Sequence, residues 1–243
     1  MTEFDRARRE DAEVDEVQRL GFLAHEMRNA LNSAVIAYRM IKTGRVGPGG
    51  NTAQMLETAH MRMRDIIDRS LVEVRLRSEP AIQFQRCRVI HLINEVEVTA
   101  SFEASAKSIQ LHIDSSSELE ILADPHLIIS ALSNLVQNAI KFTKPGGNVW
   151  IRGKARGDHV LLEVEDQCGG LPLGKAEELF QPFSQKGEDR TGLGLGLTIS
   201  RRAVSANKGE LAVRDIPNQG CVFSIDLPRA PVLTGETREA STL

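Results

Sequence analysis

The sequence has few cysteines and no long apolar run. Its three cysteines, Cys87, Cys168 and Cys221, stand far apart along 243 residues, without the Cys-x-x-Cys spacing of zinc sites or redox motifs. We interpret them as reduced packing residues. No apolar stretch approaches the roughly 20 residues of a membrane-spanning helix, and the start "MTEFDRARRE" lacks the apolar segment of a signal peptide. We therefore expect a soluble, cytoplasmic protein without membrane insertion.

Positive charge is not in excess either. The 30 lysines and arginines face 33 aspartates and glutamates, which gives a formal net charge of -3 at pH 7. Nothing in this balance attracts a polyanion, so we expect no nucleic-acid partner. The length is sufficient to bury a real core in one large or two small domains.

Helix-forming and charged residues dominate from about residue 5 to residue 78. The stretch "TGRVGPGGN" (43–51) interrupts them, because its four glycines and one proline cannot continue a helix. The pattern predicts a helical hairpin. Apolar residues recur in both arms at alternating spacings of four and three, which is typical of a coiled coil or four-helix bundle. They are Leu20, Ala24, Met27, Leu31, Ala34, Tyr38 and Ile41 in the first arm, and Leu56, Ala59, Met63 and Ile66 in the second. In the second arm Ile67, Leu71 and Val74 widen the apolar stripe.

Two helices with such broad apolar faces cannot shield them from water alone. Pairing with a second copy, to form a four-helix bundle, is the economical solution. We therefore predict a homodimer formed by a hairpin domain of residues 1–78. Residues 1–20 have the pattern of a charged helix extension.

The chain after residue 78 mixes strand-like and helical runs. Because several strands are adjacent hairpins, an α+β fold, with a mixed sheet covered by helices on one face, is favoured over a doubly wound parallel sheet. This domain is expected over 79–230, with a disordered polar tail over 231–243. The predicted strands are 82–86, 109–114, 119–123, 148–156, 159–166, 210–215 and 221–227, and the predicted helices are 89–107, 125–142 and 195–207.

The predicted helix over 125–142 has one polar and one apolar face. Asp124 can cap its start. At about 100° per residue, Asn134, Asn138 and Lys141 fall on one side, opposite an apolar back. An amide oxygen is a hard ligand for magnesium and lysine is a point charge for phosphate, so this face can floor a phosphate site. Taken alone, a solvated polar face is the better explanation.

The stretch "LLEVEDQCGGLP" (161–172) ends a strand in Asp166 and continues into paired glycines. Glycines let backbone approach a ligand closely, and a carboxylate at a strand end can accept hydrogen bonds from an exocyclic amine. Taken alone, this stretch is better explained as an ordinary strand-exit turn.

The stretch "DRTGLGLGLTISRRAV" (189–204) alternates Gly192, Gly194 and Gly196 directly ahead of an amphipathic helix. Free backbone N–H groups at a helix start bind phosphate well. A Rossmann motif needs glycine where Leu197 stands, and the chain lacks the Gly-Lys-Ser/Thr of a P-loop. These two common nucleotide folds are therefore disfavoured.

The order of these motifs is more specific than any one of them. The amide helix, the aspartate before glycines, "LFQPFSQ" (179–185) and "GLGLGLTIS" together resemble the ATP-binding domain of sensor histidine kinases, a GHKL-type domain. "FLAHEMRNALNS" (22–33), on the predicted hairpin, resembles the phospho-acceptor box of the same family. The resemblance covers roughly residues 15–228.

This resemblance implies ATP-dependent autophosphorylation of His25 and transfer to an aspartate of a response regulator. An isolated helical histidine is more often structural, but the resemblance reverses that expectation. In the family the acidic residue after the histidine acts as base or orienter, a role that falls on Glu26. The amide four positions after the histidine places water for hydrolysis of the phosphoaspartate, and here it is Asn29.

The resemblance also implies roles in the ATP site, with ATP and Mg²⁺ as cofactors. The residues that match the family's boxes are Asn138 for magnesium, Lys141 for phosphate, Asn134 lining the pocket, Asp166 for the adenine amine, Gly170 as the second glycine of that box, Phe180 and Phe183 anchoring a lid, and Gly192, Gly194 and Gly196 as the phosphate-binding hinge.

Two residues depart from the family pattern. Ala30 stands where proline is usual, so a kink below the histidine should be weaker or absent. Cys168 replaces the first glycine of the adenine-side box, which requires an ordinary φ or a shifted turn. Two alternatives remain: a serine kinase of the anti-sigma type on the same ATP fold, and a dimeric scaffold that is non-catalytic or mainly a phosphatase.

Overall fold

The computed structural model describes residues 27–44, 50–77, 82–171, 177–181 and 196–231. By their contacts the residues divide into two compact units, and the boundary between them in the sequence lies between Leu71 and Val72. No helix in these ranges combines the length and the apolar character that crossing a bilayer needs. The boundary at residues 78/79 remains a prediction, and the tail from 232 onward lies outside the described residues.

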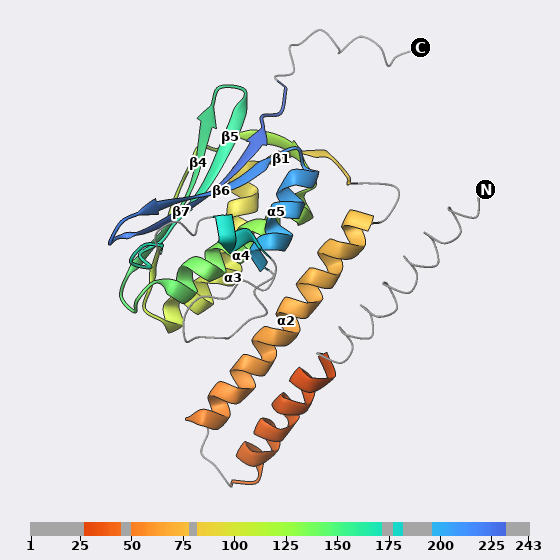
Figure 1. Ribbon diagram of the computed structural model, residues 1–243, viewed down its shortest axis with the longest axis vertical. Coiled ribbons are helices and arrows are strands. Elements are labelled where there is room, and N and C mark those ends of the chain that lie inside the picture. Colours follow the sequence, from red (N-terminus) through yellow and green to blue (C-terminus); the bar gives the residue numbers. More distant parts are fainter. Residues whose placement is uncertain (1–26, 45–49, 78–81, 172–176, 182–195, 232–243) are drawn as a thin grey trace, which may run out of the picture. The chain divides into compact units, whose positions relative to one another are not determined.

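The first unit contains the predicted hairpin as far as Leu71. One helix covers residues 27–42, the chain turns through Gly44 and Gly50 at positive φ, and α2 (Asn51–Arg77) follows (Figure 1). Left-handed backbone at the two glycines explains why the helices stop on either side of this turn. The first helix runs without a break through Ala30, as expected for a helix that lacks proline there.

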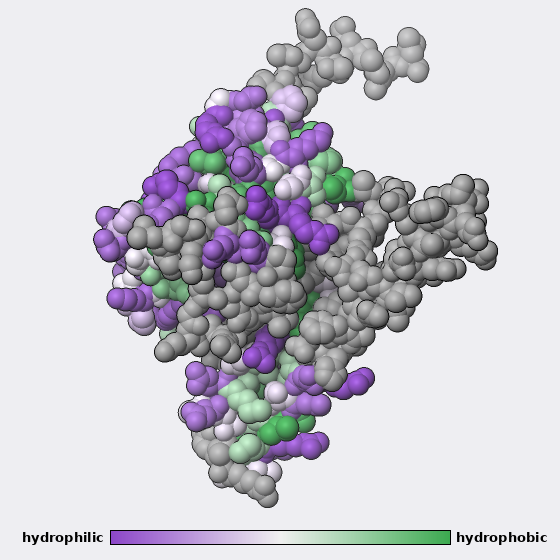
Figure 2. Space-filling model, viewed as in Figure 1, coloured by the Kyte–Doolittle hydropathy of each residue, from purple (hydrophilic) through white to green (hydrophobic). Residues whose placement is uncertain are grey.

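Small residues supply the buried side of the first helix. Ala30, Ala34 and Ala37 are all buried, whereas Leu31 and Tyr38, which the spacing placed in the seam, are 53% and 56% exposed. The apolar stripe is therefore broader than one seam, and only its alanine side is covered within a single chain. Among the described residues of this unit, the exposed large apolar side chains are those of Met27, Leu31, Val35, Ile36, Tyr38, Met55 and Ile67. Figure 2 shows apolar patches among polar ones on the loop end of the hairpin.

The described residues of the second unit form two sheets, the helices α3, α4 and α5, and one 3-10 helix. Its elements are β1 (Gln85–Arg88), α3 (Val89–Ala106), β2 (Gln110–Ser115), β3 (Glu120–Ala123), α4 (Pro125–Phe142), β4 (Asn148–Arg156), β5 (His159–Glu165), the 3-10 helix η1 (Glu177–Phe180), α5 (Gly196–Ala206), β6 (Glu210–Ile216) and β7 (Gly220–Pro228). The large sheet has the order β2-β4-β5-β7-β6, in which only β2 and β4 are parallel. The expected mixed sheet is confirmed, and helices α3, α4 and α5 lie on one of its faces (Figure 1).

The alternation of side chains along the strands explains this one-sided cover. In β5, Val160, Leu162 and Val164 are fully buried, while the residues between them are half-buried. Successive side chains of a strand point to opposite faces, so the apolar set meets the helices. The other face carries cross-strand ion pairs, such as Arg152 to Glu165 at 2.5 Å.

Helix α4 begins at a fixed point. The Asp124 carboxylate accepts hydrogen bonds from the N–H groups of His126 and Leu127, and proline occupies the first helical position. The predicted cap is confirmed. The backbone N–H of Asp124 donates to the fully buried side chain of Asn207, at 2.6 Å, which ties the start of α4 to the end of α5.

One predicted strand was misplaced. The run over 82–86 forms a strand only from Gln85, and β1 pairs with β3 in a separate two-stranded sheet. The partner strand ends at Ala123, because the next residue caps α4. Ile82 to Phe84 therefore pair with no strand in the described ranges. The N–H of Gln83 instead donates to the capping carboxylate, at 3.4 Å from Asp124 Oδ2.

Candidate nucleotide-binding site

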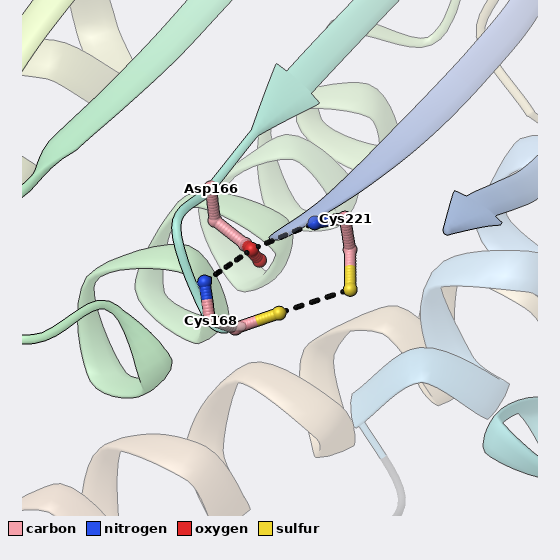
Figure 3. Close-up of side chains that lie close together, drawn as sticks. All are labelled: Asp166, Cys168 and Cys221. Atoms are coloured by element: carbon pink, nitrogen blue, oxygen red, sulfur yellow. Dashed lines mark hydrogen bonds between the residues drawn. The ribbon is translucent and has the colours of Figure 1, made fainter. Parts of the chain in front are cut away.

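The Asp166 carboxylate is buried at the end of β5. Asp166 is only 4% exposed. Its Oδ1 atom accepts hydrogen bonds from the backbone N–H groups of Cys168 and Cys221, both at 3.0 Å (Figure 3). No described residue donates a hydrogen bond to Oδ2. One oxygen therefore holds the turn, and the other can accept a bond from a ligand amine.

The turn after Asp166 is fixed on three sides. The N–H of Gln167 donates to the buried hydroxyl of Thr143, at 3.2 Å, and the N–H of Leu171 donates to the Asp215 carboxylate, at 2.6 Å. The glycine at 220 lies directly against the Asp166 carbonyl, where a Cβ would overlap it. The position of the carboxylate is thus set by α4, β6 and β7 together.

The cysteine at position 168 fits this turn with ordinary backbone. Among the described residues, only three that are not glycine have positive φ, and Cys168 is not one of them. The left-handed conformations fall on Gly169 and Gly170, at φ 90° and 100°. Of the two outcomes expected for the missing glycine, the structure therefore shows the ordinary φ.

The polar face of α4 forms as predicted. Asn134, Asn138 and Lys141 are half-buried, while the residues of the apolar back are buried. The amide of Asn134 donates to the hydroxyl of Ser200 on α5, at 2.9 Å. At the start of α5, a Cβ on Gly196 would overlap Asn134 Oδ1, so glycine there permits the close approach. The amide helix and the helix after the glycine motif are therefore in contact.

The Asn138 amide suits a metal-bound phosphate. Within the part of the chain that the structure describes, no group forms a hydrogen bond with the Asn138 side chain. A half-buried amide oxygen that accepts no hydrogen bond from any described residue fits the hard-oxygen preference of Mg²⁺, one helical turn away from Asn134. Lys141 lies a further turn along, with its ammonium 5.2 Å from the centre of the Phe142 ring.

The aromatic box is attached to α5. Phe180, at the end of η1, is 7% exposed, its ring lies 5.1 Å from the guanidinium of Arg201, and its carbonyl accepts a hydrogen bond from Thr198, at 2.9 Å. The base of the predicted lid is therefore anchored on the helix that follows it.

The remaining predicted residues are not brought to this site by the described structure. Asn29 is exposed on the helix over 27–42, in the first unit. The others lie outside the described residues: His25, Glu26, Phe183, Gly192 and Gly194.

Sequence reasoning missed the residues that support the site from a distance in the chain. Thr143, Ser200 and Asp215 carried no local motif, and their roles depend on long-range packing. The same holds for the two cysteines: Cys168 and Cys221 are 53 residues apart, yet their sulfur atoms lie 3.0 Å from each other (Figure 3). The hydrogen bond to Cys168, then burial and the nearby carboxylates, raise the pKa of the Cys221 thiol.

Comparison with known proteins agrees with this geometry. Residues 123–231 match the family described as histidine kinase-, DNA gyrase B-, and HSP90-like ATPase. The alginate biosynthesis sensor protein KinB of Pseudomonas aeruginosa is 25% identical over 214 residues. That match covers 84% of this chain and 36% of KinB, so the chain spans about a third of the length of that relative.

Solved structures extend the comparison to the fold. The catalytic domain of the histidine kinase ThkA is 28% identical, with a TM-score of 0.56, over 60% of this chain and 95% of that domain. ThkA in complex with the response regulator TrrA has the same fold over 93% of this chain and 65% of its own, with a TM-score of 0.62 at 23% identity. Residues 123–231 are therefore a histidine kinase-, DNA gyrase B-, and HSP90-like ATPase domain, and the chain is similar to sensor histidine kinases over most of its length.

Proposed function

We propose that the protein binds Mg-ATP in its second unit, autophosphorylates His25, and passes the phosphoryl group to an aspartate of a response regulator. The observation that supports this most directly is the contact between two motifs far apart in the chain. On α4, the Asn134 amide donates a hydrogen bond to the Ser200 hydroxyl, and Gly196 packs against the Asn134 side chain. Both segments are those that the family resemblance assigns to the phosphates.

Adenine recognition is proposed for Asp166. Its Oδ1 is occupied by two backbone N–H groups, which leaves Oδ2 as the acceptor for the exocyclic amine. Because both donors come from the peptide backbone, the carboxylate keeps its position before a ligand arrives. Gly170, at φ 100°, leaves the adjacent edge of the turn without a side chain.

Phosphate recognition is proposed for the face of α4 and the start of α5. Asn138 would hold Mg²⁺, which when bound neutralises charge on the phosphate oxygens. Lys141 supplies a positive charge on the same helix face, and Asn134 lines the pocket between them and α5. Gly192, Gly194 and Gly196 supply backbone N–H groups at the helix start, with Phe183 and Phe180 anchoring the lid.

The phospho-acceptor chemistry is proposed for the first unit. A neutral imidazole is a competent nucleophile, and Glu26 beside His25 would take up or orient its proton during transfer. Asn29, four residues after the histidine, is exposed and can position water for the reverse reaction on a phosphorylated regulator. Because ATP is the donor, we propose that this chemistry takes place in the cytoplasm.

Two kinds of partner follow from the proposal. The exposed apolar side chains of the hairpin, Leu31 and Tyr38 among them, require a cover, and a second copy forming a four-helix bundle would supply it. A response-regulator receiver domain is the second partner, supported by the shared fold with ThkA, which is solved in complex with TrrA. A separate sensor protein would provide the input. The hairpin over 1–78 and the ATPase domain over 79–230 are the proposed domains.

Labelled ATP tests the proposal. Wild type is incubated with Mg²⁺ and γ-labelled ATP beside His25→Ala and beside His60→Ala, an exposed histidine on α2 that matches no phospho-acceptor box. We expect acid-labile, alkali-stable label on wild type and His60→Ala, and none on His25→Ala. Acid-stable label would indicate a serine kinase instead, and label that persists without His25 would refute the assignment.

A further inference from the structure

The two sulfur atoms beside Asp166 form a pair that the proposed kinase chemistry does not use. Cys168 stands in the turn after β5, and Cys221 is the second residue of β7. Their sulfurs lie 3.0 Å apart, and both residues are free thiols (Figure 3). Each cysteine also donates its backbone N–H to the same oxygen of Asp166, so the positions of the two cysteines and of the carboxylate are linked.

We propose that Cys168 and Cys221 are a redox pair that closes to a disulfide under peroxide, and that this bond fixes the turn carrying Asp166. The significance of the turn for nucleotide binding rests on the proposed function. The bond itself does not, because it depends only on where the two thiols lie.

The separation of the sulfurs favours a disulfide over a metal. Asp166, Cys168 and Cys221 have the donor atoms of a soft-metal site. Two thiolates bound to one tetrahedral zinc, at Zn–S distances of about 2.3 Å, lie roughly 3.8 Å apart, whereas bonded sulfurs lie about 2.05 Å apart. At 3.0 Å these sulfurs are already closer than zinc would hold them.

Charge favours the same choice. Metal binding needs both thiols ionised, but the hydrogen bond to Cys168, burial, and the charges of Asp166 and Asp215 all raise the pKa of Cys221. A disulfide is neutral and adds no negative charge beside these two carboxylates. The cross-link is therefore compatible with the acidic surroundings as they stand.

Exposure assigns the order of the steps. Cys221 is 1% exposed, while Cys168 is half-buried and so meets the oxidant first. The Cys168 thiolate attacks one oxygen of hydrogen peroxide, the O–O bond breaks, and hydroxide leaves to give a sulfenic acid. Cys221 then attacks that sulfur, the S–O bond breaks, and its proton leaves with the hydroxyl group as water. Two thiols and one peroxide thus give one disulfide and two waters.

The third cysteine provides a matched control. Cys87 lies on β1, where it is 9% exposed and its sulfur contacts the carbonyls of Gln85 and Ala123. The full-length chain is prepared reduced as wild type, Cys168→Ser, Cys221→Ser and Cys87→Ser. Each is treated with hydrogen peroxide, unfolded, alkylated with N-ethylmaleimide and weighed by mass spectrometry. We expect wild type and Cys87→Ser to lose two alkylatable thiols each, with peptides 168 and 221 linked and dithiothreitol restoring both.

The serine variants decide whether the pair is specific. Cys168→Ser and Cys221→Ser should form no intramolecular link. A wild type that keeps three alkylatable thiols, or that links between chains only, would overturn the proposal. Zinc binding would also overturn the proposal. In that case wild type would retain one equivalent of Zn²⁺, both serine variants would lose it, and the bound Zn²⁺ would block oxidation of the two thiols.

Hydrogen exchange tests the effect on the turn. In the oxidised wild type we expect the amides of 166–171 to exchange at least threefold more slowly than in the reduced protein, with no such change in Cys221→Ser. Unchanged exchange would refute the claim that the bond fixes the turn. None of these measurements uses ATP, so a chain that forms the disulfide but does not phosphorylate His25 contradicts the proposed function alone.

Discussion

Replacing Asp166 by asparagine should separate nucleotide recognition from support of the turn. The Asp166 Oδ1 atom accepts from two backbone N–H groups, at 3.0 Å each. An asparagine oxygen can accept the same two bonds, and its amide nitrogen then takes the place of Oδ2. The reverse orientation would set a donor against two donors, so it is disfavoured. The turn survives, while the acceptor offered to the adenine amine becomes a donor.

The expected magnitudes follow from the bonds that each variant keeps. A hydrogen bond to a charged group contributes about 1.5–3 kcal/mol, and one between neutral groups about 0.5–1.5 kcal/mol. Asp166→Asn should therefore lower the free energy of unfolding by roughly 2 kcal/mol. Asp166→Ala leaves both N–H groups unpaired at a site only 4% exposed, and should lower it by about 3–5 kcal/mol.

Nucleotide binding should respond differently from stability. Both variants lose the charge-assisted bond that we propose between Asp166 and the adenine amine, so calorimetry should show ATP affinity weakened roughly 10- to 150-fold in each. The new amide donor in Asp166→Asn faces the position where guanine carries an acceptor oxygen, so the ratio of GTP to ATP affinity should rise.

The control for this experiment is the neighbouring carboxylate. Glu165→Gln changes a residue whose side chain pairs with Arg152 on the open face of the sheet, and ATP affinity should stay within twofold of wild type. Urea titration of all three variants gives the unfolding free energies. If Asp166→Asn bound ATP within threefold of wild type, the carboxylate would have no part in recognising the base, and its burial would be structural only.

Three further changes test other parts of the structure. Asn207→Ala removes the oxygen that accepts the buried N–H of Asp124, at 2.6 Å, so urea titration should show a loss of about 2–3 kcal/mol, and a loss below 0.5 kcal/mol would contradict this. Gly196→Ala places a methyl group against the end of the Asn134 side chain, which must rotate and give up its hydrogen bond to Ser200. We expect a cost of about 1 kcal/mol and a measurable drop in ATP affinity, whereas unchanged values would show that this hydrogen bond contributes nothing. The third change concerns pH: the folded state raises the pKa of the Cys221 thiol above its ordinary value of 9.0, so above pH 9.0 the unfolded chain releases this proton before the folded chain does. Reduced wild type should therefore lose unfolding free energy with rising pH faster than Cys221→Ala, by up to about 1.4 kcal/mol per pH unit. Equal slopes for the two proteins would refute the raised pKa.

Local patterns were sufficient to predict most of the elements. The cap at Asp124, the apolar back of α4 and the alternation in β5 are each set by residues close in sequence. The one misplaced strand shows the limit of this method. Ile82 to Phe84 have strand composition, but the pairing partner of β1 ends at Ala123, which only the three-dimensional arrangement reveals.

Contacts between distant segments were not predictable in the same way. The support of Asp166 by Thr143 and Cys221 joins residues 23 and 55 positions away, through Gln167 in the first case. Nothing in the periodicity of either segment marks such a contact, because periodicity reports which face is buried and not what it meets. The hairpin shows the same limit: spacing indicated a seam, but Ala30 and Ala37, rather than the larger Leu31, are buried within one chain.

The cysteine in the adenine-side turn shows why a departure from a family pattern is best judged on backbone geometry. Glycine at this position would matter if the backbone there had positive φ, but the structure places positive φ on Gly169 and Gly170 instead. The N–H of Cys168 still reaches Asp166, as any residue's N–H would. The side chain is then an addition to a turn that is otherwise complete, and it points to the one buried thiol within reach, Cys221. Cys168→Gly should therefore leave ATP affinity of the reduced protein within about threefold of wild type while abolishing the disulfide, and a larger change in affinity would mean that the thiol itself contacts the nucleotide.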